Sequence, residues 1–347
     1  MDSNRGGLRD QIRQSWRALG VDQSPFLGDL TPADRSWWRV LLGLIAGAVG
    51  GLVIVIILLI VIAIPVIFIV AAQGTDPARI QTFFADIQKV DFKPTYWVAL
   101  ALIWALALTN GAMMLGFVWI GSLLNHKPLR LSFTAAPHWR WRQLVGGLVF
   151  YGAVLGLMQA IEVAFTGQKL ALPVFSISHS PALTILFVIL SVPGWILAAG
   201  VEELAFRGWI LRHSAALMRW AWLYILVNGL LFSIIHWDFQ PEHFDLNAFI
   251  ARAVMGWGFS YMTLRMGGIE LSTGAHAANN LLIVMFTEPF NLGTPPAEPF
   301  TLGPLAEAAF MLVLLVGVTE AAIRVPALAR FFGPPARRPS GEEAAFS

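Results

Sequence analysis

Two adjacent glutamates and an arginine stand out in the stretch GVEELAFRGW, residues 200–209, because the flanking sequence is among the most hydrophobic in the chain. A charge near the centre of a bilayer costs between about 2.5 and well over 10 kcal/mol, so it needs a partner, water or a function. Glu203 and Arg207 are one helical turn apart with the acid first, the favourable order for an ion pair. Because consecutive helical residues point about 100° apart, Glu202 has no counter-charge on its own helix. We therefore interpret Glu203 and Arg207 as a structural pair and Glu202 as the carboxylate available for chemistry; alternatively, all three charges contact water at a helix end.

Two further segments carry polar residues within strongly apolar sequence. In LFSIIHW, Phe232 and His236 lie one helical turn apart, and in STGAHAANN, His276 and Asn280 share one face of a helix. A lone histidine on an apolar helix is more often a hydrogen-bonded packing residue than a ligand, and a histidine–asparagine pair also serves helix–helix hydrogen bonding. Small residues at 272–278 favour the close approach of neighbouring helices. Each segment alone therefore has a structural interpretation.

Together the three segments provide the groups that a hydrolytic site needs. A glutamate takes a proton from water when desolvation raises its pKa towards neutrality. Imidazoles position that water, donate to an oxyanion or hold a metal. If one divalent metal such as zinc is bound, Glu202, His236 and His276 are its expected ligands. The sequence contains neither H-E-x-x-H nor G-x-S-x-G, which argues against a zincin and against a serine hydrolase.

The elements that must position these groups are predicted to be membrane helices. The chain has 347 residues, 57% of them apolar and 13% charged, whereas about 25% of the residues of a soluble domain are charged. We predict an all-α fold, a polytopic integral membrane helix bundle with about eight transmembrane helices. Pro65 is expected to kink the first span, and the fourth is expected to run as one long helix from Pro193 to Met218, with Glu202 at mid-membrane. The predicted spans lie near residues 40–72, 96–124, 143–165, 182–218, 220–238, 247–265, 269–287 and 304–323.

The placement of lysine and arginine predicts the orientation of this bundle. With eight spans and a cytosolic N-terminus, the outer loops hold only Arg79, Lys89, Lys93 and Lys169, whereas most other basic residues fall in cytosolic segments. Both termini are therefore expected in the cytosol, and the absence of eukaryotic sorting signals favours a bacterial inner membrane. We predict five divisions of the chain. They are a cytosolic polar N-terminal segment (1–39), the N-terminal membrane helices (40–181), a catalytic core (182–290), the last membrane helix (291–323) and a cytosolic disordered tail (324–347).

Three motifs in order along the chain resemble those of the CPBP intramembrane protease family, the CAAX-processing and bacteriocin-processing group that includes the Rce1-type prenyl proteases. The resemblance covers roughly residues 182–290, and the flanking spans match only as apolar helices. The motifs are E-E-x-x-x-R (Glu202, Glu203, Arg207), F-x-x-x-H (Phe232, His236) and H-x-x-x-N (His276, Asn280).

The resemblance implies a membrane-embedded endopeptidase, a hydrolase of the metallo- or glutamate type. It implies that Glu202 activates water with His236 as its partner. His276 and Asn280 are implied to stabilise the oxyanion. The other motif residues, Glu203, Arg207 and Phe232, are implied to support the site. Glu203 is also a candidate for direct participation in the reaction.

Peptide or prenylated-peptide substrates and the lipid bilayer are the expected partners. A net charge of +2, without basic runs interleaved with aromatic residues, excludes a nucleic-acid partner. Two other functions stay open, a catalytically silent membrane scaffold and a proton-coupled transporter, since intramembrane glutamate and histidine also form proton relays. Transporters often contain two related halves, and the sequence shows no such repeat.

Overall fold

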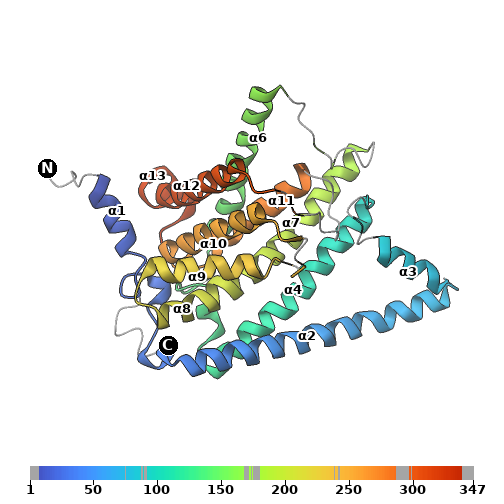
Figure 1. The fold of residues 1–347 in the computed structure, drawn as a ribbon, viewed down its shortest axis with the longest axis horizontal. Helices are drawn as coiled ribbons and strands as arrows, with labels where there is room; N and C mark the ends of the chain where they lie inside the picture. The colour runs from blue at the N-terminus through green and yellow to red at the C-terminus, as the bar shows by residue number, and fades with distance from the viewer. Residues whose placement is uncertain are drawn as a thin grey trace.

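A computed structural model describes residues 8–74, 76–86, 89, 92–167, 172, 174, 180–237, 239–240, 243–286, 297 and 299–337 (Figure 1). Within these ranges the chain is helical, as predicted, and the only β-type pairing is an isolated bridge between Thr134 and Gly268. Two π-helical segments, Gly147–Tyr151 and Leu204–Leu211, join α5 to α6 and α7 to α8. The helices are α1 (Leu8–Arg17), α2 (Trp37–Ala72), α3 (Pro77–Asp86), α4 (Tyr96–Leu124), α5 (Trp141–Gly146), α6 (Gly152–Thr166), α7 (Pro181–Glu203), α8 (Arg212–Leu217), α9 (Ala221–Ile234), α10 (Leu246–Met266), α11 (Glu270–Phe286), α12 (Leu302–Arg324) and α13 (Pro326–Phe332).

Each of the eight predicted spans contains a helix, but they are not equally suited to crossing a membrane. Among the described residues, 5 helical stretches are long and apolar enough: Trp37–Pro65, Tyr96–Leu124, Trp141–Thr166, Pro181–Leu217 and Leu302–Arg324. The shorter helix α9 has 14 residues, and α10 and α11 carry buried polar side chains that face neighbouring helices. The all-helical membrane bundle is therefore as predicted, while the number of helices that meet these criteria is smaller than the predicted eight, because α9 is short and α10 and α11 carry polar side chains.

The fourth span differs from its predicted course. The helix starts at Pro181 and continues through Pro193, so the predicted start at Pro193 is wrong. Proline has no N–H to donate to the carbonyl four residues earlier, which here is that of Ile189. The Trp104 indole of α4 donates to the next carbonyl, that of Leu190, at 3.2 Å, so α4 contacts this turn of the helix. Membrane helices commonly tolerate an internal proline where neighbouring helices contact them. The helical run is 37 residues long, from Pro181 to Leu217, which keeps the predicted long element and leaves Glu202 well inside it.

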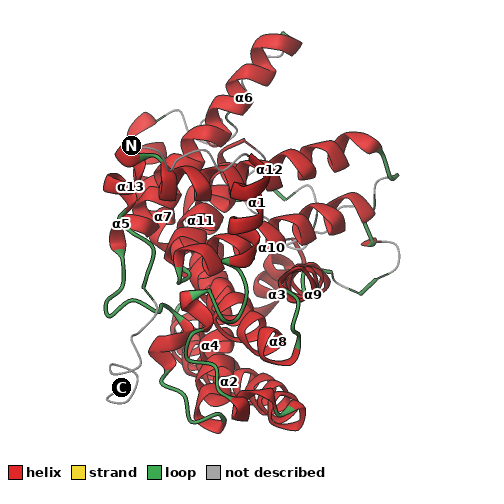
Figure 2. Ribbon diagram, turned by 90° about the vertical axis from the view of Figure 1, so that its left-hand side faces the viewer, coloured by secondary structure: helices red, strands yellow, loops and turns green. Residues whose placement is uncertain are grey.

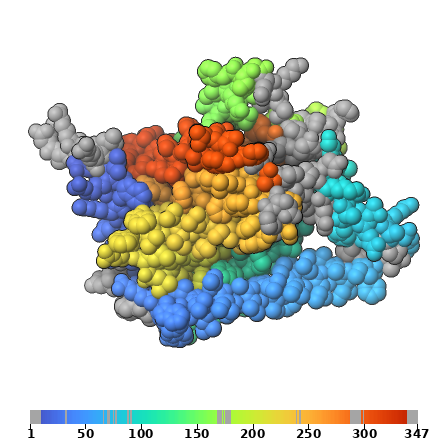
Figure 3. Space-filling view, viewed as in Figure 1, coloured from blue at the N-terminus to red at the C-terminus, as the bar shows by residue number. Residues whose placement is uncertain are grey.

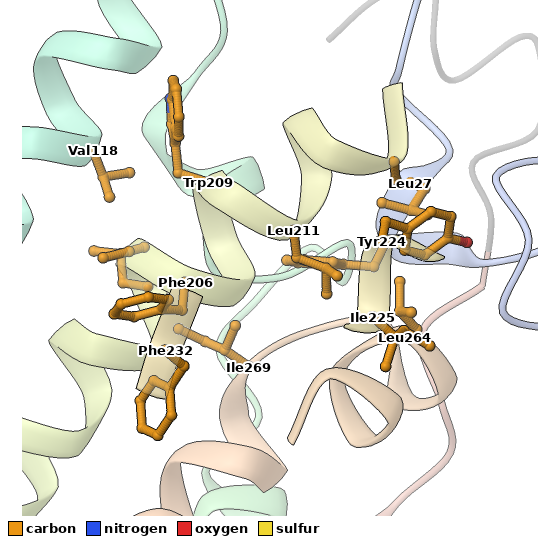
Figure 4. Packing of buried hydrophobic residues seen from close by; sticks show 14 of the residues in the cluster. Leu27, Val118, Phe206, Trp209, Leu211, Tyr224, Ile225, Phe232, Leu264 and Ile269 are labelled. Atoms are coloured by element: carbon orange, nitrogen blue, oxygen red, sulfur yellow. The ribbon is translucent and has the colours of Figure 1, made fainter. Parts of the chain in front are cut away.

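The bundle is built around α7, α10 and α11, with α6 projecting from it (Figures 1 and 2). The π-helical segment before α8 supplies much of the largest apolar cluster, in which Phe206, Trp209 and Leu211 are buried (Figure 4). Burying a large apolar side chain contributes about 1.5–3 kcal/mol. In contrast, α6 has no buried residue within its bounds. The motif residues Glu203, Arg207, Phe232 and His276 are therefore buried, whereas the residues around His236 are exposed, with Ile234 at 39% and Ile235 at 49%.

The first long helix, α2, packs on α4 through small residues near its start and leaves most of its length exposed (Figure 3). A Cβ added at Gly51 would lie 2.3 Å from the Met113 carbonyl oxygen, so only glycine allows the two helices to approach this closely. The helix continues through Pro65 to Ala72. Exposed apolar residues such as Phe68, at 72%, are suited to contact lipid.

The N-terminal segment is fixed to the bundle by charged contacts. Asp34 accepts hydrogen bonds from the Thr31 N–H at 2.6 Å and the Thr31 hydroxyl at 2.8 Å, and the Lys127 ammonium lies 3.1 Å away. Burial alone would raise the pKa of Asp34, but these hydrogen bonds and the lysine charge outweigh it and lower that pKa. Asp29 pairs with Arg212 in the same region.

The start of the predicted disordered tail is folded. Residues 326–332 form α13, and Phe332 is buried against α5 and α12 residues, so the tail prediction over 324–347 is corrected up to residue 337. Lys169, the end of the predicted core at 287–290 and the tail beyond 337 lie outside the described residues.

Candidate active site

Glu202 and Glu203 are the last two residues of α7, where the helix widens into the π-helical segment Leu204–Leu211. Such segments accommodate an extra residue in a helix and are frequent at functional sites. Because the two glutamates point in different directions, their surroundings differ. The Glu203 side chain is 0% exposed, whereas that of Glu202 is 13% exposed and borders a cavity. The structure therefore gives one glutamate a fully buried position and the other an accessible one.

Glu203 links a cation and a histidine through a single carboxylate oxygen. Its Oε1 lies 3.0 Å from Arg207 Nη1 on the next turn and 3.0 Å from His276 Nδ1 on α11. Arg207 also donates from Nη2 to the Gly256 carbonyl at 3.2 Å. A buried ion pair needs such additional hydrogen bonds to offset the loss of hydration. The ion pair predicted between Glu203 and Arg207 is present, and its contact with His276 was not predicted.

Aromatic rings hold these groups in place. The Arg207 guanidinium lies over Phe232 at 4.5 Å and over Phe259 at 5.4 Å from the ring centroids. Phe259 also stacks on the His276 imidazole, with a centroid distance of 5.1 Å and an interplanar angle of 22°. Cation–π contacts strengthen when they are removed from water. Phe232 therefore supports Arg207 directly, while Phe259, outside the three motifs, fixes the plane of His276.

Glu202 faces two imidazoles. Its Oε2 lies 3.6 Å from His236 Nε2 and 3.7 Å from His276 Nε2, and this buried oxygen has no hydrogen-bond partner among the described residues. His236 Nδ1 is 2.6 Å from the Phe232 carbonyl and His276 Nδ1 faces the Glu203 carboxylate, so both Nδ1 atoms are donors, and in neutral rings both Nε2 atoms are acceptors. With neutral rings, three acceptor atoms face one another without a donor between them, and a water molecule can donate its two protons to two of them.

The position of His236 explains how residues on successive helices reach one point. We expected His236 about 16 residues into a fifth span, where a helical rise of about 24 Å would separate it from a Glu202 at the opposite end. In the structure α9 ends at Ile234 and His236 lies in the turn that follows. Because Glu202 lies inside a long helix and α9 is short, the two side chains meet.

These groups open into a cavity of about 540 Å³ between α4, α7, α9 and α11. Asn280 lines it beside His276, and its amide makes no hydrogen bond to another described residue. Apolar side chains form most of the remaining wall, with Met113 and Met114 on α4 and Ile283 on α11. The volume lies within the range of about 300–1,000 Å³ that is usual for ligand sites. The cavity can hold a peptide segment with apolar side chains beside the polar cluster.

Asn110 on α4 also lines this cavity, and the sequence analysis did not identify it. It makes no hydrogen bond to another described residue, and it lies in a membrane helix in which nearly every neighbour is apolar. That contrast is the signal that could have found it, since polar residues within membrane spans are usually functional. Asn228 and Ser260 form a second unpredicted polar contact, at 2.9 Å, but both are buried and connect α9 to α10 away from the cavity.

A metal was expected only conditionally, at Glu202, His236 and His276. Within the described residues, no group of three or more histidine, aspartate or glutamate side chains has an arrangement that could hold a metal ion. The steps proposed below are written for the metal-free alternative.

Comparison with known proteins agrees with this geometry. Residues 181–282 match the family model described as type II CAAX prenyl endopeptidase Rce1-like. The matched region contains all three motifs, from Glu202 to Asn280. The chain is also similar to the uncharacterized protein YyaK of Bacillus subtilis (strain 168), with 29% identity over 204 residues, which cover 57% of this chain and 67% of YyaK. No solved structure gives a significant match to the chain.

Proposed function

We propose that the protein is an intramembrane endopeptidase of the CAAX-protease type, which hydrolyses a peptide bond with water activated by Glu202. The observation that carries this proposal is the convergence of Glu202 Oε2 with the Nε2 atoms of His236 and His276, at 3.6 and 3.7 Å, beside a cavity. The Rce1-like match of residues 181–282 supports the same class of reaction.

In the first step, Glu202 takes a proton from the water held between it and His236. His236 is fixed by its Nδ1 contact with the Phe232 carbonyl, at 2.6 Å, so its Nε2 is available to accept from the same water. The oxygen of the water attacks the carbonyl carbon of the scissile bond, and the carbonyl oxygen becomes an oxyanion. Positioned general-base catalysis of this kind contributes about 10²–10⁴-fold to a rate.

Asn280 and His276 stabilise the oxyanion. The Asn280 amide has free donors at the cavity wall. His276 donates from Nε2 when both ring nitrogens carry protons, and the Glu203 carboxylate at Nδ1 stabilises that form, as an acid does behind a catalytic histidine. Arg207 positions Glu203 and does not reach the cavity. In the last step the C–N bond breaks, and the proton held by Glu202 passes to the leaving amine nitrogen.

The substrate is proposed to be a peptide or a prenylated peptide that enters from the membrane. The apolar wall formed by Leu106, Met113 and Ile283 would accept apolar side chains or a lipid group near the cleaved bond. The proposed location is a bacterial inner membrane with both termini in the cytosol, on the distribution of basic residues.

The test is cleavage of a panel of prenylated and unprenylated peptides by the purified full chain in lipid nanodiscs, in water enriched in ¹⁸O. We expect one ¹⁸O atom in the new carboxylate, and a loss of cleavage of about 100-fold or more in Glu202→Gln. The matched control is Glu307→Gln, since Glu307 is an exposed glutamate of α12 away from the cavity. Cleavage by Glu202→Gln at the wild-type rate would refute the role of Glu202, and no cleavage of any peptide by the wild type would favour a silent scaffold.

Elemental analysis of the same preparations tests the absence of a metal step. We expect no stoichiometric zinc in folded, active wild-type protein. One zinc per chain that is lost in His236→Ala and in His276→Ala would replace this mechanism with metal-assisted hydrolysis.

A further inference from the structure

Helix α1 lies at one end of the bundle (Figure 1), and residues of α1, α9, α10 and α12 line a second cavity of about 540 Å³. It shares no lining residue with the active-site cavity. Tryptophans from three helices form much of its wall: Trp16, Trp222 and Trp257. The proposed hydrolysis makes no use of this groove.

The wall changes from apolar to charged along α12. Leu312, Val316, Glu320 and Arg324 follow one another at intervals of four residues, so they form one stripe on the helix, and all four line the groove. The stripe spans about 18 Å from its first residue to its last, given a rise of 1.5 Å per residue. The groove is therefore apolar at one end and charged at the other.

The neighbouring helix α10 repeats the same gradient. Trp257, Tyr261 and Arg265 also follow at intervals of four residues, and the first two line the groove. The Tyr261 hydroxyl and Arg265 Nε both lie 2.7 Å from Glu320 Oε1, which places the polar ends of the two stripes side by side. Both helices thus change from apolar to polar or charged side chains towards their C-terminal ends.

The charged end carries more positive than negative charge. Glu320 is shared by two guanidinium groups, since Arg324 Nε donates to its Oε2 at 2.6 Å and Arg265 donates to its Oε1. Arg324 also contacts α1, where its Nη2 donates to the Ser15 hydroxyl at 2.7 Å. Two cations against one carboxylate leave an excess of one positive charge. An anionic group is the complementary ligand for this end of the groove.

The groove also opens where a bilayer would meet it. Trp16 is 50% and Trp222 is 53% exposed, although both line the groove. Tryptophan is enriched at the level of the lipid headgroups, because its amphipathic ring suits the boundary between the acyl chains and the headgroups. The charged end coincides with the C-terminal ends of α10 and α12, where a membrane helix meets the headgroup region.

We propose that this groove binds one anionic phospholipid, with its acyl chains along Val316 and the tryptophans and its phosphate at Arg324. A phospholipid passes from apolar acyl chains to an anionic head. This order matches the change from an apolar wall to a basic end along the two helices. Neither a peptide nor a second copy of the chain is needed to cover the groove.

The test is native mass spectrometry of the detergent-purified full chain, titrated with phosphatidylglycerol and with phosphatidylcholine of the same acyl chains. We expect the wild type to retain phosphatidylglycerol preferentially. Val316→Trp fills the groove and should weaken binding of both lipids at least tenfold. Arg324→Gln should weaken phosphatidylglycerol binding about fivefold and leave phosphatidylcholine nearly unchanged, since one basic side chain near the bilayer is removed.

Matched controls separate this site from general contact with lipid. Val313→Trp adds the same bulk to α12 at a residue that is 68% exposed and outside the groove, and Arg330→Gln removes a charge from α13. Both should bind as the wild type does. If Val316→Trp fails to fold, Trp16→Ala on peripheral α1 tests the same wall and should also weaken binding. Equal binding by Val316→Trp, Trp16→Ala and the wild type would overturn the proposal, as would equal affinity of the wild type for the two lipids.

Discussion

Removing Arg207 tests whether the Glu203 carboxylate depends on a buried positive charge. Both side chains are 0% exposed and their charged atoms are 3.0 Å apart. At an effective dielectric constant of 20, two unit charges at that separation attract by about 5 kcal/mol. Arg207→Met leaves Glu203 with His276 as its remaining hydrogen-bond partner. Breaking one side of a buried pair costs about 3–5 kcal/mol, because the other charge is left without its partner. We expect a loss of unfolding free energy in that range.

The double variant Glu203→Gln with Arg207→Met separates this penalty from lost packing. A neutral amide has no charge to compensate, so the double variant should regain at least about 2 kcal/mol over Arg207→Met. The assay is reversible unfolding in mixed detergent micelles. The matched control is Lys89→Met, which breaks an exposed pair with Asp86 whose side chains are 62% and 40% exposed, and this change should cost less than about 1 kcal/mol.

The reasoning fails if Arg207→Met lies within about 1 kcal/mol of the wild type, since the buried charge would then be compensated without its partner. It also fails if the double variant is no more stable than Arg207→Met. Either result would mean that the Glu203 carboxylate does not depend on Arg207, and the proposed role of Arg207 as its counter-charge would have to be withdrawn.

Three further outcomes are expected. Gly256→Ala should destabilise the protein by about 1–3 kcal/mol in the same unfolding assay, because a Cβ there would lie 2.7 Å from the Gly229 Cα; Gly111→Ala, where a Cβ meets nothing within 4 Å, should be neutral or stabilising. Asn110→Leu should raise KM for peptide cleavage more than it lowers kcat, and a fall in kcat alone would contradict a role in substrate binding. Folding lowers the pKa of Asp34, so the Asp34 carboxylate stabilises the folded protein at any pH above its unfolded pKa. That contribution to the free energy of unfolding is lost as the pH falls through the folded-state pKa. The stability difference between the wild type and Asp34→Asn should thus shrink below about pH 4, and a difference constant from pH 7 to pH 3 would rule this out.

The helical class and the course of most helices could be predicted from apolar segment length. The span near 96–124 coincides with α4, because Thr95 caps its start and the apolar sequence ends at Leu124. The fourth helix was harder to predict. Pro193 is a helix breaker by local rules, whereas a membrane helix packed against its neighbours tolerates it, and α4 contacts this turn through the Trp104 indole. The π-helical widening after Glu203 has no signal of its own in a single sequence.

The site was predictable where its residues are neighbours along the chain. The contact between Glu203 and Arg207 follows from helical spacing alone. The contact between Glu203 and His276 crosses 73 positions and depends on how α11 packs against α7, which no local pattern specifies. Likewise Phe259 reaches His276 from a helix without a motif, so its role follows only from the fold.

The contacts of α1 bear on how the protein is made. Ser15 bonds to Glu320, 305 positions later in the chain, and Arg324 reaches back to Gln11 and Ser15. Chains are synthesised from the N-terminus at about 5–20 residues per second, so α1 leaves the ribosome well before its partners exist. Until α12 has been inserted, the apolar side of α1, with Ile12 and Trp16, has only the membrane surface or a chaperone to cover it. Docking of α1 would then be one of the last steps of assembly, and an α1 accessible to protease would report that the final helix is not yet in place.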